Sequence, residues 1–390
     1  MKNTNDNKQL YYFLSVYALI YMLTAIYGIF TPVYLNNMGF NSSYIGILLS
    51  IGPFISIFAQ PIWGSAGDRA SSKNNILIIM VFFSGVSFLL YKASSNFYYL
   101  FLIISIYTFF QTSINPLTDA ITLEFLDTTN LRFGSIRLAG TIGYAFMAFV
   151  AGYFSDKNIN FIFPIYFLIT IGAIIYIRKL PKIVGHQAKK NKVSVTEILK
   201  HEDIMILMLF NMMAQISLGF YNSFFPVYYK SLGAGNRLLG LAMLMAALSE
   251  TPFLLLSNKI VDKLSIKTTL LISSFIMSLR WFITYSVQNT YLMLLVNLLH
   301  GSSFIVFSYC TATYINRNIP KELKVSGQTM NGLIGMGFGR IIGSMAGGFL
   351  SDAFGIRKVF LINSVFTFII FIVFYFIFKF FKFESKEFQG

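Results

Sequence analysis

The chain has 390 residues, of which 56% are hydrophobic and only 12% are charged, about half the charged share of a soluble domain. This composition excludes a soluble globular enzyme, a disordered chain and a disulfide-linked scaffold, and three His with one Cys are too few for a multi-histidine metal site. The net charge of +15 comes from Lys and Arg residues that lie between apolar runs, which favours loops at a lipid surface over nucleic-acid binding. We therefore expect a lipid bilayer as partner and no nucleic acid, metal or cofactor.

Twelve apolar segments follow one another along the chain, each long enough for a helix through a bilayer core of about 30 Å. They are predicted to begin near Leu10, Ser43, Asn75, Phe97, Gly134, Phe161, Asp203, Arg237, Thr268, Tyr291, Val325 and Lys358. The first segment is apolar as far as about Val33, which is too long for a signal peptide. Because the segments are continuously apolar and do not alternate with a period of two, they predict an all-α integral membrane protein.

The distribution of basic residues predicts the orientation in the membrane. With the N-terminus inside, 22 of the 30 Lys and Arg residues fall on the cytoplasmic side, six fall outside, and Arg280 and Arg340 fall within spans. We therefore expect a multi-pass protein of the cell membrane with both termini in the cytoplasm.

The two halves of the chain share short motifs at nearly one offset. The pairs are Pro32-Val33-Tyr34 with Pro226-Val227-Tyr228, Asp68-Arg69-x-Ser71-x-Lys73 with Asp262-Lys263-x-Ser265-x-Lys267, Gly140-x-Ile142-Gly143 with Gly332-x-Ile334-Gly335, and Ser155-Asp156 with Ser351-Asp352. Offsets of 192 to 196 residues indicate an internal duplication. The sequence predicts a six-helix bundle over residues 1–178, a cytoplasmic loop over 179–203 and a second six-helix bundle over 204–390. Such parallel repeats are typical of transporters that bind substrate between their halves near the bilayer midplane.

This pattern resembles the major facilitator superfamily over essentially the whole chain. Between the second and third spans, Gly64-x-x-x-Asp68-Arg69 and the later Lys73 resemble the loop motif of that superfamily. The resemblance implies that these residues, and Asp262 and Lys263 in the second half, latch neighbouring helix ends on the cytoplasmic side. The alternative is an ordinary charged loop.

Ionisable residues within spans are costly and need a reason. In the first half Asp119 lies in span four, and Arg137 lies one turn inside span five with Thr141 and Tyr144 on the same helix face. Because Arg suits a carboxylate or paired hydroxyls, we expect these four residues to bind substrate. The alternative is a static ion pair between Asp119 and Arg137.

The second half holds Glu250, Arg280, His300 and Arg340 within its spans. Desolvation makes a buried carboxylate bind a proton more readily and a nearby Arg opposes this, so Glu250, Arg280 and His300 are candidates for proton coupling. A lone His in a membrane is more often a packing residue, and only the company of Glu250 and Arg280 favours the coupling role. Arg340 has no obvious partner, and it either binds substrate or balances Glu250.

A closer resemblance is to the lactose permease group of oligosaccharide–proton symporters. Its fifth, ninth and tenth helices resemble Phe133-Gly134-x-x-Arg137-x-x-Gly140-x-x-Gly143-Tyr144, Met277-Ser278-x-Arg280 and Leu299-His300, respectively. The resemblance implies that Asp119, Arg137 and the following aromatic residue bind sugar, and that Glu250 and His300 link sugar to proton. The phenylpropionate permease and nucleoside symporter groups share the fifth-helix pattern.

The chain departs from that group in span ten, where Ser303 and Asn297 replace an acid and a Lys, and span seven lacks an acid. Either Glu250 or Asp119 is then the only proton carrier, or Arg280 and Arg340 hold an anionic substrate.

These observations predict a secondary transporter, working as a monomer by alternating access, that couples protons to the symport of a small solute such as a sugar or nucleoside. One alternative is the uptake of an aromatic or other organic anion. Another alternative is drug efflux. The absence of Pro from span five argues against this alternative. A membrane enzyme or a non-transporting sensor lacks support, because there is neither a nucleophile–base constellation nor a loop long enough for an output domain.

Overall fold

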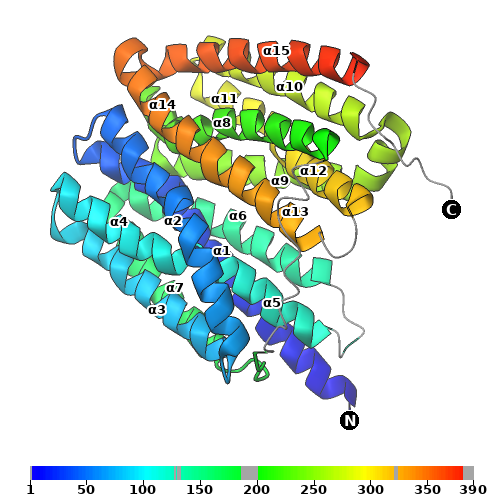
Figure 1. Ribbon diagram of the computed structural model, residues 1–390. Coiled ribbons are helices and arrows are strands. Elements are labelled where there is room, and N and C mark those ends of the chain that lie inside the picture. Colours follow the sequence, from blue (N-terminus) through cyan, green and yellow to red (C-terminus); the bar gives the residue numbers. More distant parts are fainter. Residues whose placement is uncertain (1, 127–128, 130–132, 186–200, 320–323, 381–390) are drawn as a thin grey trace. The chain divides into compact units, whose positions relative to one another are not determined.

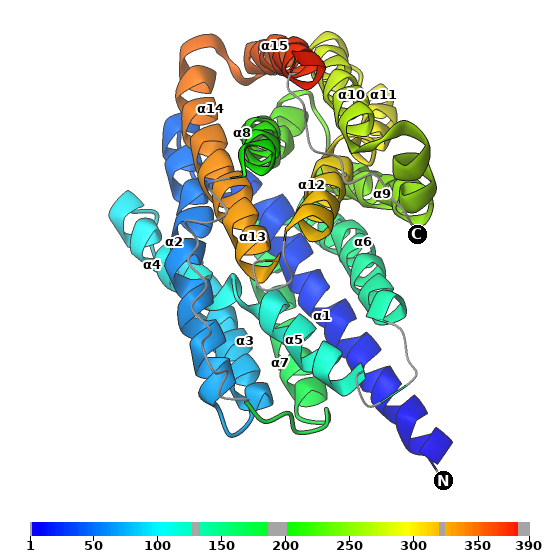
Figure 2. The same cartoon turned by 45° about the vertical axis from the view of Figure 1, so that its right-hand side comes forward.

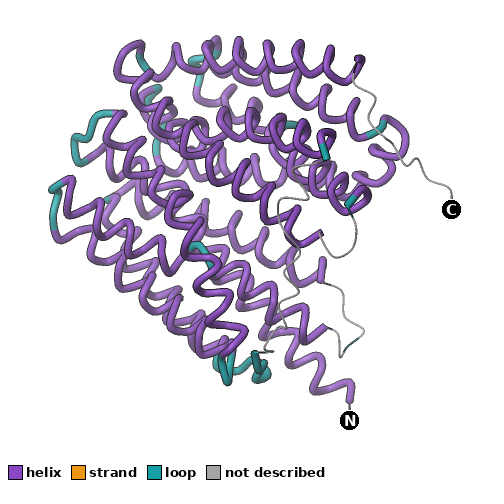
Figure 3. The backbone as a smooth tube through the Cα atoms, in the orientation of Figure 1, coloured by secondary structure: helices purple, strands orange, loops and turns teal. Residues whose placement is uncertain are grey.

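The computed structural model describes the chain except residues 1, 127–128, 130–132, 186–200, 320–323 and 381–390. Throughout the described part the secondary structure is helical, without strands (Figure 3). Twelve helices there are long and apolar enough to cross a membrane by length and composition. The predicted all-α fold with twelve membrane-spanning helices is therefore confirmed.

The first six spans come from nine helices and helical turns of the first half (Figure 1). They are α1 (Lys2–Asn37), α2 (Ser42–Arg69), α3 (Lys73–Leu90) with the 3₁₀ turn η1 (Tyr91–Ala93), α4 (Phe97–Gln111) with α5 (Ile114–Leu126), α6 (Phe133–Lys157), and η2 (Ile159–Phe161) with α7 (Ile162–Ile177).

The last six spans follow the same plan in the second half. They are α8 (Glu202–Ser231), α9 (Asn236–Leu264), α10 (Ile266–Ser286), α11 (Thr290–Asn297) with η4 (Leu298–His300) and α12 (Phe304–Asn318), α13 (Lys324–Asn331) with η6 (Gly332–Gly339) and α14 (Arg340–Phe354), and α15 (Ile356–Phe380).

Each span begins within two residues of its predicted start. The agreement has a simple cause: the polar residues between apolar runs mark where a helix can leave the hydrocarbon core.

The described helices group into two compact units. Unit 1 comprises residues 1–40, 47–189 and 233–244, and unit 2 comprises residues 41–46, 190–232 and 245–390. The first turns of α2 and α9 therefore belong to a different unit from the rest of the same helix. Most of the predicted central loop, residues 186–200, lies outside the described residues.

In unit 1 the long helix α1 packs against α6 and α7 (Figure 2). The close approach of α1 and α6 depends on Gly143, where a Cβ atom would lie 2.3 Å from the carbonyl oxygen of Ala18. The fully buried Phe88 and Tyr107 stand against the ring of Tyr27 in the same core. Small residues in α6 thus let large aromatic residues fill the rest of the unit.

In unit 2 the corresponding pair is α8 and α14, and α10 runs beside α15 (Figure 1). Gly343 of α14 meets α8 so closely that a Cβ atom would lie 2.0 Å from the carbonyl oxygen of Ile216. Gly335 of the repeated glycine motif also approaches α8, because its Cβ atom would lie 2.7 Å from Nδ2 of Asn211, so the motif marks close helix contacts in both units.

The internal repeat is also visible in individual hydrogen bonds. The hydroxyl of Tyr34 donates to the carbonyl of Tyr91 at 3.4 Å, and the equivalent Tyr228 donates to the carbonyl of Thr284 at 3.3 Å. Asn96 caps α4 and Asn289 caps α11 with the same pair of side-chain bonds to backbone N–H groups. The duplication has thus preserved local contacts as well as helix order.

A second contact is repeated at the ends of the two spans that carry the Ser-Asp motif. The carboxylate of Asp352 accepts from the backbone N–H groups of Ser42 and Ser43 at 2.8 Å, and Asp156 accepts from the N–H of Asn236 at 2.6 Å. Each carboxylate therefore caps the N-terminus of another helix, α2 or α9, within one unit.

Candidate functional site

Three spans are irregular near their middle. The fourth is broken between α4 and α5, the tenth between α11 and α12, and the eleventh contains the π-helix η6. Pro116, near the start of α5, lacks the N–H that would continue the ladder of the fourth span. Irregular backbone within a membrane span is tolerated where protein or a water-filled cavity covers it, and it often marks functional positions.

Asp119, the predicted acid of span four, lies on α5 and is half-buried. The hydroxyl of Tyr17 on α1 donates to its Oδ1 atom at 2.6 Å. A phenol fixes one carboxylate oxygen and leaves the other Asp119 oxygen able to accept a further hydrogen bond.

Arg137 on α6 lies over the ring of Tyr21, with its Cζ atom 4.2 Å from the ring centroid. Tyr21 itself stacks on Tyr17, so Asp119 and Arg137 are linked through two aromatic rings. The ion pairs of the described residues do not include one between Asp119 and Arg137.

The residues that share the helix face of Arg137 are half-buried, as Arg137 is. These are Thr141 and Tyr144. Asp119, Arg137 and the rings of Tyr17 and Tyr21 therefore form a cluster within unit 1, and Thr141 and Tyr144 lie further along the same face of α6.

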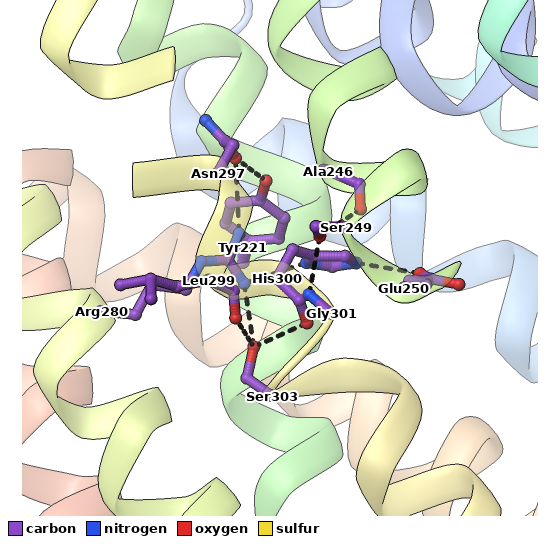
Figure 4. Close-up of polar contacts among 10 residues, drawn as sticks. All are labelled: Tyr221, Ala246, Ser249, Glu250, Arg280, Asn297, Leu299, His300, Gly301 and Ser303. Atoms are coloured by element: carbon purple, nitrogen blue, oxygen red, sulfur yellow. Dashed lines mark hydrogen bonds and ion pairs between the residues drawn. The ribbon is translucent and has the colours of Figure 1, made fainter. Parts of the chain in front are cut away.

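The second-half candidates meet at His300, which ends η4 (Figure 4). Its Nδ1 atom lies 2.9 Å from an NH1 atom of Arg280, and its Nε2 atom lies 3.5 Å from Oε1 of Glu250. Glu250 and Arg280 thus lie on opposite sides of one imidazole ring.

This geometry determines the tautomer of His300. An arginine can only donate, so Nδ1 must be the accepting, unprotonated nitrogen. The ring proton of the neutral imidazole is then on Nε2 and points toward Glu250. A proton on Nδ1 would break the contact with Arg280.

Arg280 on α10 is 1% exposed and has neutral neighbours on its other sides. It donates to Ser303 Oγ at 3.3 Å and to Asn297 Oδ1 at 3.4 Å, and its Cζ atom lies 4.3 Å from the ring centroid of Tyr221. Tyr221 in turn donates to Asn297 at 2.6 Å. The two departures from the lactose permease pattern in span ten are therefore both ligands of this buried guanidinium.

At the break in the tenth span, the backbone contacts α9. The N–H of Gly301 donates to Ser249 Oγ at 2.8 Å, and a Cβ atom on Gly301 would lie 1.9 Å from the carbonyl oxygen of Ser249. Glu250 directly follows Ser249, so the same contact positions the carboxylate beside His300.

Arg340 opens α14 and is half-buried. Its Nε atom donates to Oε1 of Gln215 on α8 at 3.2 Å, and its Cζ atom lies 6.0 Å from the ring centroid of Phe304. Phe304 stacks on His300, which brings Arg340 to the edge of the Glu250–His300–Arg280 cluster. Among the described residues, no acid forms an ion pair with Arg340.

The loop-motif residues have separate surroundings. Lys73 is buried and pairs with Glu124 of α5, and the backbone N–H of Lys73 donates to the carbonyl of Ile183 at 2.8 Å. In the second half Asp262 lies 3.7 Å from Arg317, and both side chains are partly exposed. Gly64, Asp68, Arg69 and Lys263 take part in no ion pair within the described ranges.

Sequence reasoning overlooked the neutral partners of the charged residues. Tyr17, Tyr21, Gln215, Asn297 and Ser303 contact the acids and cations directly. Asn297 and Ser303 stand three residues before and after His300, which places all three on one side of a helix and is the signal that could have found them.

Comparison with known proteins identifies the family. Residues 10–362 match the model described as the MFS_1 like family. The uncharacterized transporter YwbF of Bacillus subtilis is 26% identical over 83% of this chain and 82% of its own length. The maltose permease of Geobacillus stearothermophilus is 24% identical over 92% and 91%.

The crystal structure of the nucleoside transporter NupG superposes with a TM-score of 0.86 at 19% identity, over 95% of this chain and 99% of the other. This likeness shows the major facilitator fold. The relatives are transporters, which confirms a membrane transporter and not an enzyme. The predicted resemblance is likewise confirmed, and the chain belongs to the MFS_1 like family.

Proposed function

We propose that the chain is a proton-coupled symporter of the cell membrane, with both termini cytoplasmic, that imports a small polar solute related to sugars or nucleosides. The observation that supports this most is the row Glu250, His300, Arg280 in unit 2. It joins a carboxylate that can bind a proton to a permanent cation through an imidazole.

The Glu250 carboxylate is the proton site in this proposal. Its side chain is 23% exposed, whereas that of His300 is 11% exposed, so Glu250 is the member of the row that solvent protons reach more readily. A proton on Glu250 removes the negative charge that faces His300 Nε2 and leaves Arg280 without a nearby negative charge. The protonation state of one residue therefore changes the electrostatics of the whole cluster.

The first-half cluster supports a hydroxylated cargo. Arg137 and the Asp119 oxygen that Tyr17 does not contact offer donors and an acceptor beside tyrosine rings, a combination suited to a sugar or nucleoside. Relatives of the chain include a maltose permease and a putative nucleoside transporter. Transport then requires that proton and cargo bind the inward-open and outward-open states with different affinities.

The test is uptake by the purified chain in proteoliposomes, with and without an inward proton gradient, for a galactoside, a nucleoside and phenylpropionate. We expect the gradient to drive accumulation of the cargo. In Glu250→Gln, accumulation against a gradient should be lost while downhill exchange continues, because the amide cannot carry the proton.

The matched control is Glu202→Gln, the same change at the exposed first residue of α8. It should accumulate cargo as the wild type does. Wild-type accumulation by Glu250→Gln would remove Glu250 from the coupling step, and uptake of every cargo independent of the gradient would remove proton coupling altogether.

A further inference from the structure

Arg340 has hydrogen-bond donors that the described residues leave unused. Its Nε atom donates to Gln215, and no hydrogen bond or ion pair occupies its two terminal nitrogens within the described chain. In Arg280 the two terminal nitrogens are bound by His300, Ser303 and Asn297, and the donor left without a partner among the described residues is the buried Nε atom.

Gln215 adds a further unused donor at the same place. Its side chain is fully buried, its Oε1 atom accepts from Arg340, and its Nε2 atom has no partner among the described residues. An arginine paired with a neutral amide in a membrane span stays positively charged, and buried donors without acceptors cost free energy. Both features are relieved by an anion.

The backbone keeps Arg340 at this position. A Cβ atom on Gly219 of α8 would lie 2.9 Å from the Cα atom of Arg340, so α8 and α14 touch directly at this residue. The π-helix η6 ends immediately before it. Arg340 is therefore held on a closely packed frame, with its free end toward Phe304.

The net charge of the buried ionisable residues in unit 2 also favours an anion. Away from the helix ends, the described spans of the second half carry Arg280, Arg340, Glu250 and the neutral His300. The cluster has one more positive than negative charge when Glu250 is ionised. A neutral cargo brought in with a proton on Glu250 would raise this excess to two charges inside the membrane.

We propose that the cargo is an organic monoanion whose carboxylate is bound by Arg340 and Gln215. This rests on the proposed proton symport and specifies its substrate class. With the carboxylate on Arg340 and a proton on Glu250, the loaded cluster has the same net charge as the empty one. Symport of one proton with one monoanion moves no net charge, so the loaded cluster avoids the cost of a second excess cation.

One competing partner for Gln215 lies on the same helix. Asn211, one turn earlier, donates to Asn331, and its Oδ1 atom has no partner in the described part of the chain. A rotation of side chains that joined Gln215 Nε2 to this oxygen would still leave the terminal nitrogens of Arg340 unpaired. The proposal therefore depends chiefly on Arg340.

The test compares acid and neutral forms of the same molecules on the full-length protein in detergent. Galacturonate and phenylpropionate should raise the melting temperature, and galactose and phenylpropanol should not. In proteoliposomes, the uptake of an accumulated acid should respond to a pH gradient and not to a membrane potential. A wild-type protein that responds to neither acid, or to the neutral forms equally, overturns the proposal.

Gln215→Glu tests the site itself. A permanent carboxylate at this position would occupy Arg340, so affinity for the acids should fall by about 10- to 100-fold while the melting temperature of the ligand-free protein stays equal or rises. Arg340→Gln should lose the same affinity, and Arg357→Gln, the same change at the start of α15, should keep it. Wild-type acid affinity in Gln215→Glu contradicts the assignment.

The two proposals fail in different ways. Acid-specific binding and uptake that ignore the pH gradient would leave the anion site in place and remove proton coupling. Gradient-driven uptake of galactose but not galacturonate would keep proton symport and remove the anion site.

Discussion

The imidazole of His300 has a different hydrogen-bonding role at each of its two nitrogens. Nδ1 accepts from Arg280, and Nε2 faces Glu250 as a donor. Because the two roles belong to different ring atoms, they can be separated by substitution. The side-chain amide of Asn extends about as far from the backbone as Nδ1 of His does. The side-chain amide of Gln extends about as far as Nε2.

We expect His300→Gln to keep most gradient-driven accumulation, because its amide can still donate to Glu250. His300→Asn should lose accumulation by about tenfold or more, since only the contact with Arg280 survives and a hydrogen bond to a charged group is worth about 1.5–3 kcal/mol. The measurement is the steady-state accumulation ratio as a function of external pH. A higher accumulation ratio in His300→Asn than in His300→Gln would show that the Arg280 contact matters more than the Glu250 contact. It would contradict the proposed role of Nε2 as a donor to Glu250.

Residue-level reasoning on the sequence found the charged groups and missed their neutral ligands. A charge within a span is visible in the sequence because it is rare and costly there. Tyr17, Gln215 and Tyr221 are polar residues of ordinary types, and nothing in their local sequence shows that they contact Asp119, Arg340 and Arg280, respectively.

At the scale of the helices, two N-termini are capped by carboxylates from distant helices. Asp352 at the end of α14 accepts from the first residues of α2, and Asp156 at the end of α6 accepts from Asn236 at the start of α9. The carboxylates satisfy N–H groups that have no partner within their own helix and lie at the positive end of the helix dipole.

We expect Asp352→Ala and Asp156→Ala each to destabilise the protein by about 0.5–2 kcal/mol, the usual effect of removing a helix cap. Thermal unfolding in detergent would measure it. The control is Asp262→Ala, whose 3.7 Å ion pair with Arg317 is partly exposed and should contribute about 0–1 kcal/mol. Equal small effects for all three variants would show that the two contacts are not stabilising caps.

The helix boundaries were predictable, whereas the breaks within spans were not. Polar residues between apolar runs mark the ends of each helix, so every start was found to within two residues. The break around His300 lies where Gly301 packs against Ser249, which is 52 residues away in sequence. A contact of that kind leaves no periodic signal in span ten.

At the scale of the whole molecule, the distribution of basic residues predicts which ends of the helices face the cytoplasm. Two serines at opposite ends of the third span allow a direct test, because both are exposed and both can become cysteine. Ser71 precedes α3 on the predicted cytoplasmic side, and Ser95 follows η1 on the predicted outer side. The buried Cys310 is the only native thiol and can be replaced by alanine.

In the Cys310→Ala background, a membrane-impermeant maleimide added to intact cells should label Ser95→Cys and spare Ser71→Cys. Permeabilised cells should label both, which controls for reactivity. The reverse pattern in intact cells would mean that the termini lie outside the cell.

The sequence by itself determined the number of spans, their boundaries, the duplication and the charged residues of each half. These properties follow from the cost of placing polar groups in hydrocarbon, which acts on each segment separately and therefore appears in local composition. Only the tertiary structure decided that His300 stands between Glu250 and Arg280, that Tyr17 donates to Asp119, and that Arg340 meets Gln215 without an acid. Those contacts join helices far apart in the chain, and the packing that selects them is a property of the folded unit and not of any one segment.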